Sequence, residues 1–206
     1  MKIKTVVVGP IETNCHILCG TSTSIVIDPG AELSKIMRDT DGIALPITHI
    51  IYTHGHWDHT GVGRELKKAT GAKLLMCKDD LNMLNMAATP TGLMFGAVGD
   101  PGVPDTFVCD GDKIRSGDME LVVLQTPGHS PGSISLLTEK ILFSGDTLFK
   151  DSVGRTDLPG GDQHIIISSI RKKLFVLPDD VTVFPGHGGI TNIKYEKKFN
   201  PYVSML

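Results

Sequence analysis

Hydrophobic residues in this chain occur mainly in short runs separated by Gly, Pro and Asp, a pattern typical of short buried β-strands. Between several of these runs, apolar residues recur at helical spacing. The runs predict strands at Ile3–Val8, Cys15–Leu18, Ser24–Ile27, Ile47–Tyr52, Lys73–Met76, Thr106–Val108, Met119–Leu124, Ile134–Leu137, Lys140–Phe143 and Val181–Phe184. The helical spacing predicts helices at Glu32–Asp39, Gly61–Ala69, Lys78–Ala87, Gln163–Leu174 and near Lys194–Lys198. The mixture indicates an α/β or α+β fold.

Turn residues join these predicted elements. Two-residue turns at Thr21–Ser22 and Glu139–Lys140 predict hairpins between neighbouring strands. Residues 89–105 contain four glycines and three prolines and predict a long irregular loop. No low-complexity linker divides the chain, so we expect residues 1–206 to form one domain.

Polar residues follow the predicted strands in a repeated order. In the first half Asp28 follows one strand and His54 the next; in the second half Asp146 and His187 do the same. A helix is predicted between the two strands of each half, as in a duplicated unit. Because side chains at strand ends commonly build sites in α/β proteins, we expect chemistry at these positions.

Composition and charge narrow the classes of function. The chain has 206 residues, of which 40% are hydrophobic, and a net charge of -3 with 20 scattered basic residues. It therefore offers no basic face for nucleic acid and no membrane anchor. The N-terminus lacks a signal-peptide core, and the four cysteines form no CxxC pair, so we expect a cytoplasmic protein with reduced thiols that acts on small molecules.

The stretch 53-THGHWDHTG-61 concentrates metal-binding side chains. His54, His56, Asp58 and His59 fall within six residues, although the chain has only eight histidines. Extended backbone puts His54 and His56 on one side, and the helix predicted from Gly61 turns the other two back toward the same space. Such a string arises by chance in roughly one in a thousand similar chains. Imidazole and carboxylate ligands suit zinc, manganese or iron.

Further ligands are expected from distant loops, because one loop cannot complete two metal sites. His129 lies in PGHSPG, Asp146 in SGDT and His187 in PGHG, each just after a predicted strand. Each alone is weak, because a lone loop histidine or aspartate is usually a surface or capping residue. Together, at successive strand ends, they outweigh that interpretation and are expected to be further metal ligands.

These motifs, in this order, resemble the metallo-β-lactamase superfamily and specifically its glyoxalase II-like hydrolases of the short bacterial type. The matching stretches are VIDPG at 26–30, THGHWDHTG at 53–61, TPGHSPGS at 126–133, SGDTLF at 144–149, GRTDLPGGD at 154–162, LPDD at 177–180, PGHGG at 185–189 and the tail from Thr191 to Pro201. They span nearly the whole chain. The resemblance implies a four-layer αββα sandwich with the metal centre at one edge of the sheets.

The resemblance also implies a role for each ligand. His54, His56 and His129 would hold one divalent ion, and Asp58, His59 and His187 would hold the other, with Asp146 bridging both. The expected ions are zinc, with iron or manganese as alternatives. Asp28 matches a position that supports the ligand loop in the family, although an Asp before Pro29–Gly30 is equally typical of a simple turn. His16, His49 and His164 match no ligand and are interpreted as structural.

The implied activity is hydrolysis of thioesters such as S-lactoylglutathione by a metal-bridged hydroxide, with Asp58 as the catalytic residue that holds it. Arg155 stands where full-length glyoxalase II enzymes carry a substrate-binding lysine, so we expect it to bind substrate or to pair with Asp157 or Asp151. Those enzymes also carry a C-terminal helical extension that supplies basic residues to glutathione, whereas this sequence stops at Leu206, so we do not expect glutathione to be bound in the same way. Two alternatives stay open: a persulfide dioxygenase with a single iron, since GRTD recurs there, and a metal-binding domain without catalysis. The sequence predicts no oligomeric state.

Overall fold

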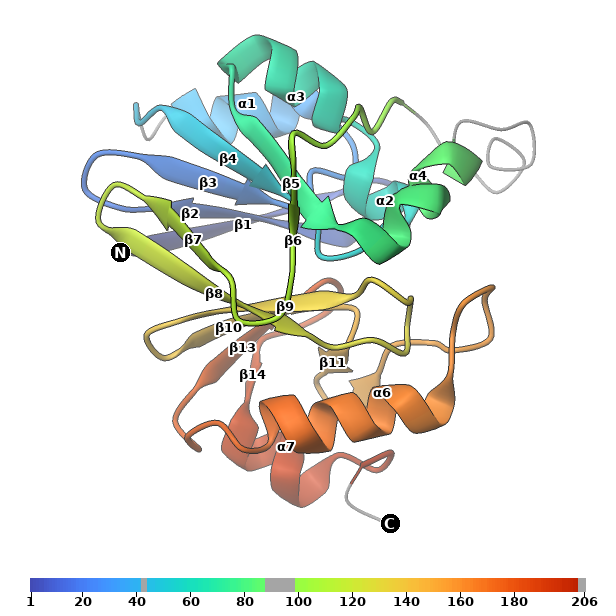
Figure 1. Cartoon of the computed structure of the whole chain (residues 1–206). Coiled ribbons are helices and arrows are strands. Elements are labelled where there is room, and N and C mark those ends of the chain that lie inside the picture. The colour runs from blue at the N-terminus through green and yellow to red at the C-terminus, as the bar shows by residue number, and fades with distance from the viewer. Residues whose placement is uncertain (42–43, 88–98, 204–206) are drawn as a thin grey trace.

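A computed structural model describes residues 1–41, 44–87 and 99–203, which contain two six-stranded sheets (Figure 1). The first has the strand order β1-β2-β3-β4-β5-β6. Its strands are β1 (Lys2–Val8), β2 (Thr13–Cys19), β3 (Ser24–Ile27), β4 (Ile47–Ile51), β5 (Lys73–Cys77) and β6 (Thr106–Val108). β1, β2 and β3 pair antiparallel, whereas β3 to β6 run parallel.

The second sheet has the order β14-β13-β10-β9-β8-β7. Its strands are β7 (Lys113–Ser116), β8 (Met119–Gln125), β9 (Ile134–Thr138), β10 (Ile141–Gly145), β13 (Thr182–Pro185) and β14 (Thr191–Asn192). Only β10 and β13 pair parallel. A small hairpin of β11 (Leu148–Phe149) and β12 (Ser152–Val153) follows β10.

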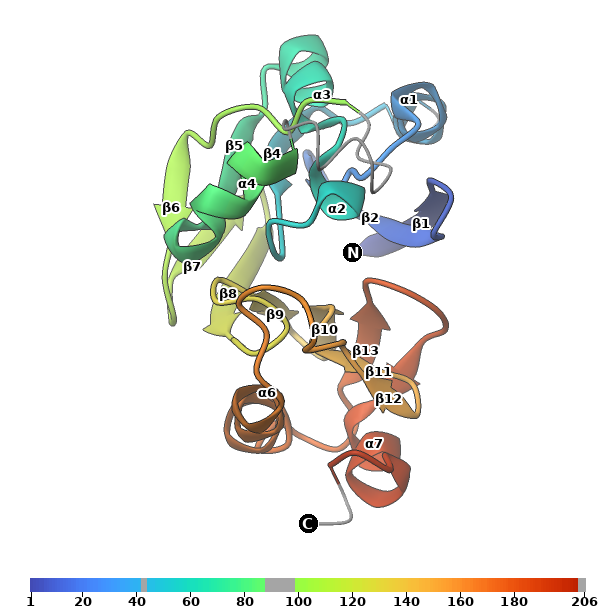
Figure 2. The same cartoon turned by 90° about the vertical axis from the view of Figure 1, so that its right-hand side faces the viewer.

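Helices cover the outer face of each sheet, which gives four layers (Figures 1 and 2). α1 (Leu33–Asp41) and α3 (Gly63–Thr70) lie on the first sheet, and α6 (Gln163–Ser169) with α7 (Ile193–Phe199) on the second. The remaining helical segments are α2 (Trp57–Thr60), the 3-10 turn η1 (Lys78–Asp80), α4 (Leu81–Ala87) and the π-helical turn η2 (Ile170–Leu174). Side chains cap two helix starts: Asp162 accepts from the Ile165 N–H and Asn192 from the Tyr195 N–H.

Three separate apolar cores hold the layers together, because strand side chains alternate between two faces. Val26 and Ile50 pack toward α1 and α3, whereas their neighbours Ile27 and Ile51 pack between the sheets. In the second sheet Leu142 packs toward the α6 side. The predicted αββα sandwich is therefore confirmed.

The predicted elements agree with most of this architecture. The turn at Glu139–Lys140 joins β9 to β10 as expected, whereas residues 20–23, rather than two residues, join β2 to β3. The predicted helix at Gly61–Ala69 begins at Gly63, after the separate helix α2. Residues 89–98 of the predicted loop lie outside the described residues, and 99–105 are irregular as expected.

The repeated Asp and His positions occupy equivalent places in the two sheets. β3, α1 and β4 form one parallel unit, and β10, α6 and β13 form the other. Asp28 directly follows β3 and Asp146 directly follows β10, while His54 and His187 follow β4 and β13. Within the described residues, no helix is both long and apolar enough to span a bilayer.

Candidate metal centre

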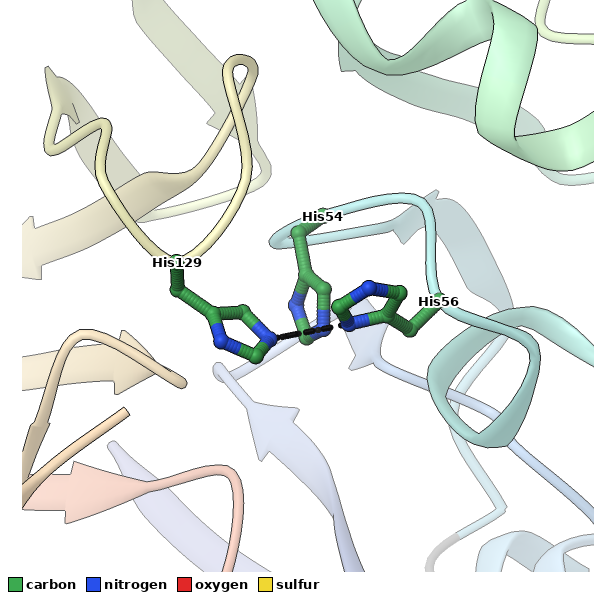
Figure 3. Close-up of side chains that lie close together, drawn as sticks. All are labelled: His54, His56 and His129. Carbon is green, nitrogen blue, oxygen red and sulfur yellow. Dashed lines mark hydrogen bonds between the residues drawn. The ribbon is translucent and has the colours of Figure 1, made fainter. Parts of the chain in front are cut away.

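Three histidine rings from two loops point toward one another (Figure 3). His54 and His56 lie between β4 and α2, and His129 lies between β8 and β9. Nε2 of His129 is 2.8 Å from Nδ1 of His56 and 3.3 Å from Nε2 of His54. His54 and His129 are fully buried. One nitrogen from each ring therefore converges on a single point, as the ligands of one metal ion do.

A second group of donors lies beside the first. Nε2 of His187 is 3.3 Å from Nε2 of His59 and 3.2 Å from Oδ2 of Asp58. Nε2 of His59 is 3.1 Å from the same carboxylate oxygen. Asp58 and His59 belong to α2, whereas His187 follows β13 in the other sheet. These three donor atoms form a second group that could hold an ion.

Asp146 lies between the two groups. Its Oδ2 is 3.6 Å from Nε2 of both His129 and His187, and its Oδ1 is 3.5 Å from Nε2 of His59. Oδ1 is buried and, among the residues that the structure describes, has no hydrogen-bond partner. A buried carboxylate oxygen is expensive to leave unpaired, so a cation at this point would satisfy it.

The outer nitrogens of His129 and His187 are fixed by backbone carbonyls. Nδ1 of His129 donates to the carbonyl oxygen of Arg155 at 2.8 Å, and Nδ1 of His187 donates to that of Ile11 at 3.1 Å. A carbonyl only accepts, so the proton of each neutral ring is on Nδ1. The lone pair of each Nε2 therefore faces the cluster.

Asp28 performs the same task for His59. Its Oδ2 accepts from Nδ1 of His59 at 2.9 Å and from the hydroxyl of Thr53 at 2.7 Å, and its Oδ1 accepts from the Thr53 N–H. Because the Thr53 hydroxyl donates to Asp28, its oxygen can accept from Nδ1 of His54, 3.1 Å away. The structure thus places Asp28 behind the histidines, where it orients two rings.

Burial and mutual repulsion keep two imidazoles neutral. Burial, followed by the nearby histidines, lowers the pKa of His54 well below its usual range and lowers that of His56 to about 3. Neutral imidazole is the form that binds metal. His54 and His56 are therefore already in the protonation state that binds a metal ion.

The carboxylates dominate the second group. Burial lowers the pKa of His59, but Asp58, Asp146 and Asp28 outweigh it and raise that pKa well above its usual range. For Asp58, burial raises the pKa, yet His59 and His187 outweigh it and the net pKa is well below normal. Metal binding here must therefore displace protons from histidine.

The donor set fits divalent ions. Within the described ranges, Asp58 and Asp146 form ion pairs only with histidines, and no lysine or arginine neutralises them. Nitrogen and oxygen donors without thiolate suit zinc, manganese or iron. The structure brings together all seven residues predicted as ligands: His54, His56, Asp58, His59, His129, Asp146 and His187.

Glycines allow the backbone to approach these ligands closely. A Cβ at Gly30 would lie 1.5 Å from the backbone oxygen of Asp58, and one at Gly154 would lie 1.8 Å from that of Asp146. A Cβ at Gly186 would lie 2.2 Å from Oδ1 of Asp146. The glycines in the VIDPG, GRTD and PGHGG stretches therefore provide room for the centre.

Two residues absent from the sequence prediction also contact the ligand loops. The hydroxyl of Thr13 donates to Oδ2 of Asp58 at 3.0 Å, and the buried carboxylate of Asp80 contacts both loops of the first group. In the sequence, Thr13 and Asp80 are each a polar residue beside an apolar run. Many turn residues fit the same description, so the pattern did not identify them as contacts of the ligand loops.

The backbone of Arg155 contacts the first group, whereas its side chain pairs with Asp157. Its backbone oxygen holds His129, whereas its guanidinium forms two hydrogen bonds with Asp157, at 2.8 and 2.7 Å. The side chains of Arg155 and Asp157 are 61% and 68% exposed. The pair is therefore open to exchange with a charged ligand.

The other histidines lie apart from the donor groups. His16 is buried against Phe143 and Phe184, and His164 is exposed on α6. His49 lines a surface cavity of about 280 Å³ at the starts of β5 and β6, together with Lys73. None of the donors lines this cavity.

Comparison with known proteins identifies the same superfamily that the sequence motifs resemble. A family model described as the metallo-β-lactamase superfamily matches residues 8–187. Hydroxyacylglutathione hydrolase GloC of Haemophilus influenzae is 32% identical over 99% of this chain and 99% of its own. A structure titled BLEG-1 B3 metallo-β-lactamase is 31% identical, with a TM-score of 0.90, and covers 98% of this chain and 100% of its own. A di-iron-bound form of TTHA1623 is 32% identical, with a TM-score of 0.88 over 97% of this chain and 99% of its own.

Proposed function

The chain belongs to the metallo-β-lactamase superfamily, and on that premise we propose that it is a binuclear metal-dependent hydrolase of small thioesters. The proposed ions are zinc, with iron or manganese as alternatives. The observation that carries the proposal is the convergence of two donor groups on either side of Asp146, whose buried Oδ1 has no partner in the described part of the chain.

Two comparisons support the details. The relative named hydroxyacylglutathione hydrolase acts, by its name, on a thioester of a small thiol. The structure titled as di-iron-bound supports a centre with two ions and leaves iron as a candidate. We extend both to this chain as parts of the proposal.

Two divalent ions, when bound, supply Lewis acidity, which polarises a carbonyl and makes water nucleophilic at neutral pH. Within the chain, His54, His56 and His129 would hold the first ion, His59 and His187 with Asp58 the second, and Asp146 would contact both. The backbone and Asp28 contacts hold the rings in the required tautomers. The ligands therefore need little rearrangement during the reaction.

Asp58 is the proposed catalytic residue. The nearby histidines hold its pKa well below normal, so it remains a carboxylate and can accept a hydrogen bond from the attacking water. The hydroxyl of Thr13 donates to its Oδ2 and fixes its orientation. Water aligned in this way can attack the substrate carbonyl, so that a carbon–oxygen bond forms and the carbon–sulfur bond breaks. The acyl group leaves as a carboxylic acid, and the departing sulfur takes up the proton that the water loses, which makes it a thiol.

Arg155 is the proposed contact for a substrate carboxylate. Its guanidinium already binds a carboxylate through two hydrogen bonds, that of Asp157. An exposed ion pair contributes little to stability, about 0–1 kcal/mol, so a substrate carboxylate can replace Asp157 at low cost. Because the Arg155 backbone holds His129, the bound group would lie near the first ion.

The test uses purified protein with its metal content measured. S-Lactoylglutathione should be cleaved at equal rates with and without oxygen, chelation should abolish cleavage, and added zinc should restore it. A persulfide of a small thiol should cause no oxygen uptake. Oxygen uptake with one iron per chain would instead make the protein a mononuclear iron dioxygenase. Two bound metals without cleavage of any thioester would overturn the substrate class alone.

A further inference from the structure

Asp80 is a buried carboxylate in contact with both loops that carry the first donor group. It ends η1, the turn that follows β5, and its side chain has no exposed surface. It is not one of the seven proposed ligands. Its position after a strand of the first sheet places it beside the loop that follows β4.

The carboxylate accepts three hydrogen bonds from described residues. Oδ2 accepts from the N–H of Gly55 at 2.9 Å and from the hydroxyl of Ser130 at 2.6 Å. Oδ1 accepts from the N–H of Gly132 at 2.6 Å. Gly55 lies between His54 and His56, and Ser130 follows His129. One side chain thus ties together the two loops whose rings form the first group.

The close approach depends on the two glycines. A Cβ at Gly132 would lie 2.6 Å from the backbone nitrogen of Asp80, and one at Gly55 would lie 2.9 Å from its backbone oxygen. A larger residue at either position would push a ligand loop away from the carboxylate. The spacing of the loops is therefore determined by direct contact with Asp80.

The charge of Asp80 has no basic partner. Among the residues that the structure describes, no lysine or arginine forms an ion pair with it, although Asp80 is fully buried. Three hydrogen bonds offset part of the cost of burying an ionised carboxylate. A dication held by His54, His56 and His129 would offset more, because Asp80 contacts Gly55 and Ser130, the sequence neighbours of those ligands.

We propose that Asp80 is the positioning residue of the first metal site, which it supports as Asp28 supports His59 in the second. Asp28 contacts the ring nitrogen of His59 directly, whereas Asp80 acts through the backbone and hydroxyl groups beside the ligands. It sets the distance between the His54–His56 loop and the His129 loop, and it supplies negative charge to that site. This inference rests on one part of the proposed function, the binding of two metal ions, and does not depend on the substrate.

The test measures zinc affinity at each site separately. In a His187→Ala background the first site remains, and in a His54→Ala background the second. Adding Asp80→Asn should raise the zinc dissociation constant of the first site by roughly 10- to 100-fold and that of the second by less than about threefold. The amide has one acceptor oxygen for three donors, so at least one loop contact is lost. Competition with a chromophoric chelator gives both constants.

Glu196 provides a matched control. It is equally buried, and its carboxylate accepts from the hydroxyl of Thr191, the amide of Asn200 and the N–H of Asp151, none of which is a proposed metal ligand. Glu196→Gln should lower the melting temperature and leave both zinc constants unchanged. Asp80→Asn should reduce the rise in melting temperature that zinc causes, beyond any loss in the metal-free protein.

Ser130→Ala keeps the charge of Asp80 and removes one donor, so it tests the proposal even if Asp80→Asn fails to fold. It should weaken the first site in the same direction, by a smaller factor. Equal weakening of both sites, or unchanged zinc constants with lower stability, would make Asp80 purely structural. If the wild-type protein binds two ions and Asp80→Asn keeps both affinities, only this inference fails. If the wild type binds no zinc, the proposed function fails with it.

Discussion

Asp28 accepts a hydrogen bond from Nδ1 of His59, on the opposite side of the ring from Asp58 and Asp146. The imidazole therefore lies between carboxylates at both nitrogens. This arrangement orients the ring and increases its basicity, and both effects strengthen a bond from Nε2 to a metal ion.

Removing the charge of Asp28 should weaken the second site. Asp28 has a φ of +54°, a conformation that asparagine also tolerates, so Asp28→Asn preserves the backbone. We expect zinc affinity at the second site to fall by roughly 10- to 100-fold. Competition with a chelator measures this affinity. The control is Asp162→Asn, which makes the same chemical change at the N-cap of α6, where the side chain accepts from the Ile165 N–H. An unchanged affinity would mean that Asp28 serves only the turn.

The number of ions per chain should follow the two donor groups. Protein purified without chelator should contain close to two ions. His54→Ala or His129→Ala should remove one, and His59→Ala or His187→Ala the other. Elemental analysis of each variant checks this. Full activity with one ion and with His187→Ala would rule out the binuclear centre.

Gly186→Ala should weaken metal binding without unfolding the protein. The added methyl would lie 2.2 Å from Oδ1 of Asp146 and 2.8 Å from Cε1 of His59, so the ligands must shift. Overpacking of this kind costs about 1–3 kcal/mol, or roughly a 5- to 150-fold loss in affinity. Gly189→Ala is the matched control, because a Cβ there would have no described residue within 4 Å. Equal zinc affinities of the two variants would contradict the prediction.

Arg155→Ala should discriminate between substrates. If the guanidinium binds a carboxylate, transition-state stabilisation should fall by about 1.5–3 kcal/mol on a carboxylate-bearing thioester and stay unchanged on a neutral one. Measurement of kcat/KM for both substrates gives the difference. Equal losses, or lower thermal stability with unchanged kinetics, would show that the pair with Asp157 merely orders the loop.

His16 should make stability depend on pH. Burial lowers its pKa from 6.5 to about 4, although the Pro185 carbonyl opposes the shift. The unfolded chain therefore binds a proton between pH 6.5 and 4 that the folded chain does not, so the free energy of unfolding falls as pH falls through this window. The contribution is on the order of 3 kcal/mol. Denaturant titrations of the chelated protein should show a flatter pH profile for His16→Gln than for the exposed control His164→Gln.

Much of the fold was predictable because its signals are local. Val26 and Ile27 are consecutive apolar residues, as are Ile50 and Ile51. Because consecutive strand residues point to opposite faces of a sheet, each pair already predicts that both faces of its strand are buried. Strand β7 (Lys113–Ser116) was missed because Ile114 is its single large apolar residue, and α2 (Trp57–Thr60) because its ligands leave no room for an apolar stripe. β14 has only two residues and exists through its pairing with β13.

The candidate ligands were predictable from motifs, but the residues that hold them were not. The link from Thr13 to Asp58 crosses 45 residues, and that from Asp80 to Gly132 crosses 52. Such contacts depend on how the sheets stack and carry no local periodicity. The pairing of Arg155 with Asp157 was one of the alternatives considered from sequence, whereas its backbone contact with His129 was not.

Both donor groups take ligands from both sheets, and this links the lifetime of the chain to its metal supply. His54 and His129 are 75 residues apart, and His59 and His187 are 128 apart. An unfolded chain cannot assemble either group. A free metal concentration 1,000 times the dissociation constant of a site therefore raises the free energy of unfolding by about 4 kcal/mol for each ion. Protein synthesised under metal starvation would therefore be partly or fully unfolded far more often than the metal-bound protein. Its turnover by cellular proteases would therefore report on the availability of divalent ions.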